Sequence, residues 1–198
     1  MIGTVLTRSF EAPPLCRAEM LRYAGAKGAR EDSIEKLLEQ CINELCGTLC
    51  YKVSYVTLSC TVKGDICDFG AFCVRSAKLA GNLAGCPQVL LFAATLGASP
   101  DRAVARYGVT SPAKALLMQA IGAERIEALC DLFCREYGRE HGVTLGARFS
   151  PGYGDVSLEV QRDIFRILQC PTKLGLCLNE SLLMSPAKSV TAFVGVKA

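Results

Sequence analysis

The sequence has no tryptophan, a single histidine and no hydrophobic run long enough to cross a membrane. With His141 alone, a Ser/His/Asp or Cys/His relay is hard to assemble, so we do not expect covalent hydrolysis. The longest apolar run, from Val89 to Ala98, is about half as long as a membrane span requires. At the N-terminus no basic end leads into an apolar run, so no secretory signal is predicted. We therefore expect a cytoplasmic protein with no membrane partner.

Neither basic nor acidic residues dominate the sequence. The 22 basic and 19 acidic residues are interspersed, and the formal net charge is +3. A protein that follows the phosphates of DNA or RNA usually carries a basic stripe, and this sequence contains none. Glycine-rich phosphate loops of the two standard spacings are absent as well. We therefore expect no nucleic-acid partner.

Cysteine, in contrast, is abundant, with 12 residues. No C-x-x-C motif occurs, and the close pairs Cys46/Cys50 and Cys130/Cys134 are each spaced by one helical turn. This spacing gives poor support for a zinc or iron–sulfur site. Because no secretory signal is predicted, a disulfide framework is not expected either. We interpret most of these cysteines as small buried side chains in the reduced state.

Four segments have the residue types of β-strands. Residues 51–58 and 66–69 are predicted to form two antiparallel strands, with turn chemistry at Lys63-Gly64-Asp65. Residues 89–96 are apolar on both faces, which is typical of a central strand covered by helices. Residues 189–196 predict a strand that closes the chain.

Helical periodicity is clearest in three segments. Apolar residues recur at helical spacing over 34–49, and Ser33 is a candidate cap. Ser-Pro pairs at 99–100 and 111–112 predict two helix starts, in which serine caps and proline takes the first helical position. The second of these helices is the longest, with an apolar stripe that runs up to Gly138. Shorter helices are expected over residues 16–24, over 74–83 and after Ser157.

This order of elements predicts the fold class. Helices and strands are interleaved, but an early hairpin is present and a regular strand-helix-strand rhythm is not. We therefore predict an α+β fold in one domain over residues 1–198, with a largely antiparallel, twisted β-sheet flanked by helices. Residues 1–90 would supply N-terminal helices and a hairpin.

The candidate functional segment is residues 148–155, with the sequence Arg-Phe-Ser-Pro-Gly-Tyr-Gly-Asp. Pro151 lacks a backbone donor, and Gly152 and Gly154 open backbone conformations that side chains forbid, so we predict a tight loop that approaches a ligand closely. The rigid guanidinium of Arg148 can meet a carboxylate through two parallel hydrogen bonds. The alternative is an ordinary surface turn beside a solvated charge.

The motifs resemble a known family. Arg148-x-x-Pro151-Gly152-Tyr153, followed by Glu180-Ser181-x-x-Met184-x-Pro186 and Ser189-Val190, resembles the C-terminal activation domain of cobalamin-dependent methionine synthase. Residues 91–97 and 111–128 are similar to stand-alone versions of that domain. The resemblance implies that residues 91–198 bind S-adenosylmethionine.

The resemblance also implies an activity and partners. Such a domain helps to return cob(II)alamin to methylcobalamin, with a methyl group from S-adenosylmethionine and an electron from a flavodoxin-like reductant. The cobalamin would be carried by a partner, either a methionine synthase that lacks its own activation domain or another corrinoid protein. A non-catalytic module that binds S-adenosylmethionine or a corrinoid protein, as a sensor or chaperone, is the alternative. An unrelated small-molecule enzyme on a similar fold is a third possibility.

The resemblance also implies which residues bind the ligand. It assigns no catalytic residue and no metal ligand. Arg148 would bind the carboxylate of S-adenosylmethionine, and Tyr153 would hydrogen-bond or pack beside the sulfonium. Loop backbone would line the nucleoside, and Glu127 would face the ammonium, although an ordinary solvated glutamate is the alternative reading. The residues expected to contact S-adenosylmethionine are Arg148, Ser150, Pro151, Gly152, Tyr153, Gly154 and Glu127.

Overall fold

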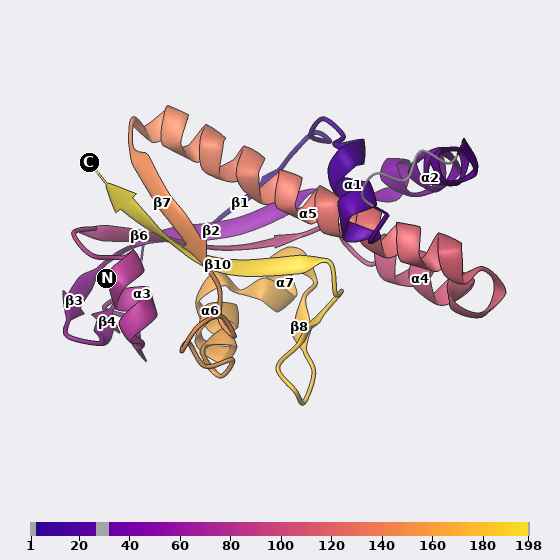
Figure 1. Cartoon of the computed structure of the whole chain (residues 1–198). Helices are drawn as coiled ribbons and strands as arrows, with labels where there is room; N and C mark the ends of the chain where they lie inside the picture. Colours follow the sequence, from indigo (N-terminus) through magenta and orange to yellow (C-terminus); the bar gives the residue numbers. More distant parts are fainter. Residues whose placement is uncertain (1–2, 27–31, 198) are drawn as a thin grey trace.

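A five-stranded sheet forms the centre of the computed structural model, which describes residues 3–26 and 32–197 (Figure 1). The strand order is β1-β2-β6-β10-β7, and all four neighbouring pairs are antiparallel. The strands are β1 (Leu6–Ser9), β2 (Lys52–Ser59), β6 (Gln88–Thr95), β10 (Ser189–Lys197) and β7 (Thr144–Phe149). The predicted α+β fold with a largely antiparallel sheet flanked by helices is confirmed.

The sheet is covered on both faces, and β6 shows this most clearly. Its residues Leu90, Phe92 and Ala94 pack against α5 (Pro112–His141). The intervening residues face the opposite layer of α3 (Ala77–Asn82), α6 (Val160–Leu168) and α7 (Cys170–Leu174). Figure 1 shows α5 on one side of the sheet and α6 and α7 on the other. A strand buried on both faces has to be apolar throughout, so the prediction of a central strand at 89–96 is confirmed.

A third layer of helices lies beyond one end of the sheet (Figure 1). It consists of α1 (Arg17–Tyr23), α2 (Asp32–Leu45) and α4 (Ser99–Thr110), which pack with the first half of α5 around a separate apolar core. A short 3-10 helix, Cys46–Thr48, follows α2, so the predicted helix over 34–49 ends earlier than expected. Within residues 3–26 and 32–197, no helix combines the length and apolar composition that a membrane crossing requires.

The predicted pairing of residues 51–58 with 66–69 is wrong. The turn at Gly64 does join two antiparallel strands, but these are β3 (Thr61–Lys63) and β4 (Ile66–Asp68), which form a separate sheet with β5 (Cys73–Arg75). Strand β2 instead pairs with β1 and β6. Turn chemistry is local, whereas the partners of a mostly buried strand are chosen by the burial of its side chains.

Several predicted helix ends are also wrong. Ser99 is the first residue of α4 and Ser111 precedes α5 without a side-chain hydrogen bond, so neither serine caps its helix. Ser33 lies inside α2, which begins at Asp32. Helix α5 continues past Gly138 to His141, and Gly142 follows as its C-cap, with a φ of 63° that suits a glycine. The segment predicted as one helix over 74–83 contains the end of β5, a serine cap at Ser76 and α3.

A buried ion pair fixes the N-terminal segment to α5. Arg125 is fully buried and donates two hydrogen bonds of 2.5 Å to the carboxylate of Glu124. The same guanidinium donates to the carbonyl oxygens of Pro13 and Pro14 at 2.6 and 2.7 Å. The backbone N–H of Cys16 donates to Glu124 at 3.2 Å. These contacts stabilise the connection between β1 and α1, because a buried charge needs its partners.

We predict that Glu124→Gln lowers the free energy of unfolding by about 3 kcal/mol, because it leaves the buried charge of Arg125 uncompensated. Urea denaturation measures the change. The matched control is Glu159→Gln, which breaks an exposed ion pair with Arg162, and its effect should stay within about 1 kcal/mol. Equal effects of the two substitutions would contradict the structural role of the buried pair.

Candidate functional site

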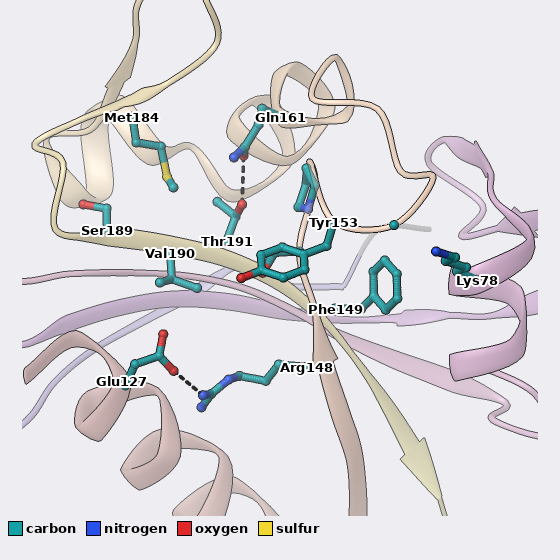
Figure 2. A pocket seen from close by; sticks show the side chains of 13 residues that line it. Lys78, Glu127, Arg148, Phe149, Tyr153, Gln161, Met184, Ser189, Val190 and Thr191 are labelled. Atoms are coloured by element: carbon teal, nitrogen blue, oxygen red, sulfur yellow. Dashed lines mark hydrogen bonds and ion pairs between the residues drawn. The ribbon is translucent and has the colours of Figure 1, made fainter. Parts of the chain in front are cut away.

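A cavity of about 590 Å³ opens where the end of β7 meets the start of β10 (Figure 2). Its volume falls within the range of roughly 300 to 1,000 Å³ that is typical of small-molecule sites. Elements from both halves of the chain contribute to its walls. The lining residues are Lys78, Glu127, Arg148, Phe149, Ser150, Pro151, Tyr153, Gly154, Gln161, Met184, Ser189, Val190 and Thr191.

The cavity brings together most of the residues that the sequence suggested. Those that line it are Glu127, Arg148, Ser150, Pro151, Tyr153 and Gly154. Gly152 does not line it, since its α-carbon faces Leu158, and an added Cβ would lie 3.4 Å from Leu158 Cγ. Tyr153 is 73% exposed and therefore stands at the rim. Whether these residues bind a ligand stays a prediction.

The segment 148–155 is only partly a loop. Arg148 and Phe149 belong to β7, where Arg148 lies opposite Val194 of β10, so these two residues of the segment predicted as a loop lie in a strand. The sheet thereby fixes the backbone that carries the guanidinium. Beyond Phe149 the chain turns as predicted, with Gly152 and Gly154 at φ 85° and 63°, in the region that favours glycine.

Arg148 is held by two carboxylates of α5. Its Nη2 donates to Glu127 at 2.6 Å and its Nη1 to Asp131 at 2.6 Å. Burial alone lowers the pKa of Arg148, but neighbouring groups that include both carboxylates raise it above its ordinary value. The guanidinium is therefore charged, and it is paired with one carboxylate that lines the cavity, Glu127, and one that does not, Asp131. From the sequence, Arg148 and Glu127 were expected to bind different groups of the ligand, and their ion pair was not predicted.

Asp155 ties the glycine corner to the start of α3. Its carboxylate accepts a hydrogen bond from Ser76 Oγ, one of 2.9 Å from the backbone N–H of Ala77, and weaker ones from that of Lys78. Ser76 in turn caps α3 by accepting from the N–H of Leu79 at 2.9 Å. The corner and α3 are thereby fixed to each other, and this brings Lys78 to the cavity wall.

Comparison with known proteins bears on the fold. No family model matches the sequence, and no curated protein matches it. A crystal structure described as the MetH reactivation domain bound to AdoHcy is similar, with a TM-score of 0.68 over 98% of this chain and 79% of that chain. This chain shares the fold of that domain. The two sequences are 15% identical, so the similarity to the MetH reactivation domain shows the fold alone.

Several residues of the cavity wall were not predicted from the sequence. Met184, Ser189 and Val190 belong to the second motif of the resemblance, but no contact with a ligand was assigned to them. Gln161 and Thr191 are buried and share a hydrogen bond of 2.8 Å. A polar residue on the apolar side of α6 was the available signal for Gln161. Lys78 had no such signal, because only tertiary packing places α3 beside the loop.

Glu180 and Ser181 of the second motif do not line the cavity. Both are exposed between β8 (Cys177–Leu178) and β9 (Met184–Ser185).

Within the described ranges 3–26 and 32–197, no group of three or more His, Cys, Asp or Glu residues could hold a metal ion. All cysteines are free thiols, and burial raises the pKa of Cys60 to about 11.

We predict that Asp155→Asn destabilises the protein at neutral pH but not in strong acid. The Ser76 hydroxyl and the N–H groups of α3 lower the pKa of Asp155 below its ordinary value of 3.8. The stabilisation from Asp155 is therefore full above that value and is lost as the pH falls through the lower, folded-state pKa.

Thermal unfolding of the wild type and the variant from about pH 6 down to about pH 2 measures this effect. The difference in midpoint should be largest at the higher pH and should close in acid. Asp163→Asn serves as the control, because Asp163 forms an exposed ion pair with Arg166 one turn away on the same helix. A difference that stays constant over the whole range would rule out the charged hydrogen bonds of Asp155 as its cause.

Proposed function

We propose that this chain binds S-adenosylmethionine in the cavity and supports the reductive methylation of cob(II)alamin on a partner protein. The observation that carries the proposal is a cavity beside the Arg148-x-x-Pro151-Gly152-Tyr153 corner, in a fold shared with a domain crystallised with AdoHcy. AdoHcy, S-adenosylhomocysteine, is the compound that S-adenosylmethionine becomes when it gives up its methyl group.

The cavity suits the chemistry of this ligand. S-adenosylmethionine carries a carboxylate and an ammonium on one carbon atom, and the cavity offers a guanidinium and a carboxylate side by side at Arg148 and Glu127. Apolar and aromatic surface from Phe149, Pro151 and Val190 supplies the wall that a nucleoside needs. The residues expected from the sequence therefore keep their proposed roles, with the exception of Gly152, which shapes the corner.

Binding requires an exchange of partners at Arg148. The carboxylate of the ligand takes the place of Glu127 at Nη2, and Glu127 then accepts hydrogen bonds from the ligand's ammonium. Asp131 does not line this cavity, so it keeps its hydrogen bond to Nη1 and holds the guanidinium in place. Glu127 also lines a second cavity, which leaves it room to move. The number of charge pairs does not fall in this exchange.

The methyl transfer itself needs no general base from this chain. When bound, S-adenosylmethionine supplies the methyl group, and the acceptor is the cobalt of the partner. The task of this chain is to hold the ligand in line with that cobalt and to exclude water. The partner is a cobalamin-dependent methionine synthase that lacks its own activation domain, or another corrinoid protein, and a flavodoxin-like protein is the reductant.

We predict that calorimetry detects binding of S-adenosylmethionine and that Arg148→Ala weakens it about tenfold or more, because charge-assisted hydrogen bonds contribute about 1.5 to 3 kcal/mol each. Arg162→Ala, which removes an exposed arginine outside the cavity, should leave the affinity unchanged. Absence of binding to the wild type, or equal affinity of the Arg148→Ala variant, would remove the basis of the proposal.

A second measurement tests the activity. The chain is mixed with a methionine synthase that lacks an activation domain, S-adenosylmethionine and a reductant, and the absorbance of cob(II)alamin is followed. We expect cob(II)alamin to be converted with the wild-type chain and much more slowly with Arg148→Ala. A change in cobalt coordination without methylation would instead indicate a non-catalytic binding module, either a sensor or a chaperone.

A further inference from the structure

Lys78 is a cationic residue of the cavity wall. It lines the same cavity as Arg148 and Tyr153. Within residues 3–26 and 32–197, its ammonium makes neither an ion pair nor a hydrogen bond to another side chain. Arg148, in contrast, is held by two carboxylates. An unpaired charge beside a cavity acts directly on whatever the cavity holds.

The position of Lys78 is fixed by the structure around it. Its backbone lies in the first turn of α3, which Asp155 ties to the glycine corner. Its stem packs over Gly154, where an added Cβ would lie 2.7 Å from Lys78 Cδ. Figure 2 shows Lys78 reaching the cavity from the side of Phe149 that is opposite Arg148 and Glu127. The two ends of the cavity therefore differ in their side chains, with the Arg148 guanidinium and its two carboxylates at one end and the ammonium of Lys78 at the other.

We infer that Lys78 is a specificity-determining residue that disfavours ligands with a positively charged sulfur. The inference rests on the proposed function. S-adenosylmethionine and S-adenosylhomocysteine share the nucleoside, the carboxylate and the ammonium, and they differ in the charge of the sulfur and in one methyl group. The ammonium is attracted to the acidic end of the cavity in both ligands. In the proposed binding mode the sulfur lies beside Tyr153, between that end and Lys78, and the positive charge that Lys78 repels at this position is present in the methylated ligand alone.

The size of the effect follows from Coulomb's law. Lys78 is exposed, so the surrounding water screens its charge. For a separation of ~6 Å between the ligand sulfur and the Lys78 ammonium, and with the dielectric constant of water, the repulsion between the two unit charges corresponds to about a threefold change in affinity. Added salt reduces this repulsion, because the screening length falls to about 8 Å at physiological ionic strength and to about 3 Å at 1 M.

The experiment is a calorimetric comparison of the two ligands at low and at high ionic strength. The dissociation constants of S-adenosylmethionine and S-adenosylhomocysteine are measured for the wild type, Lys78→Met, Lys78→Arg and Lys63→Met. The ratio of the two constants is the readout, because the steric effect of the methyl group cancels between variants. Lys63 is an exposed lysine of β3 that does not line the cavity, so Lys63→Met controls for the loss of one unit of net charge.

We expect Lys78→Met to shift the ratio about threefold in favour of S-adenosylmethionine at low ionic strength, and less at high ionic strength. Lys78→Arg and Lys63→Met should leave the ratio unchanged. If both ligands bind and the ratio is the same in Lys78→Met, or if both affinities fall equally, the charge of Lys78 does not discriminate and the inference is wrong. Failure of both ligands to bind the wild type would instead overturn the proposed function, and this inference with it.

Discussion

The ion pairs of Arg148 are the constraint on which the cavity depends. They join the end of β7 to two carboxylates one turn apart on α5, and so they hold the border of the sheet against the long helix. A half-buried guanidinium with partners on both of its terminal nitrogens has little freedom to rotate. One side of the cavity is therefore formed before any ligand arrives, with the guanidinium of Arg148 paired to both Glu127 and Asp131.

The opposite side of the cavity depends on a different set of contacts. The glycine corner after β7 turns back toward α3, and Asp155 fixes it there through Ser76 and the first N–H groups of the helix. Because Gly154 has no side chain, Lys78 can lie across it. Both sides of the cavity are thus formed by short segments that are attached to a strand or a helix. Such attachment is what holds binding groups in a set geometry.

The sheet explains why these segments meet. Strand β6 is apolar on both faces and is paired on both edges, and it carries two separate cores, one under α5 and one under α3, α6 and α7. Strand β10 lies between β6 and β7, and the last residue of β7, Phe149, lies opposite Phe193, so the first residues of β10 extend past the end of β7. The cavity opens at this border, between the layer of α5 and the layer of α3 and α6. Residues distant in sequence therefore share one wall.

The sequence by itself determined the features that depend on neighbouring residues. These include the apolar central strand, the glycine corner with its left-handed backbone, and the presence of an arginine before it, because dihedral preferences and periodicity act over a few positions. Only the tertiary structure decided the partners of β2, the pairing of Arg148 with Glu127 and Asp131, and the entry of Lys78 into the cavity. Each of these contacts joins segments far apart in the chain, and its geometry follows from how buried faces pack, which no local pattern specifies.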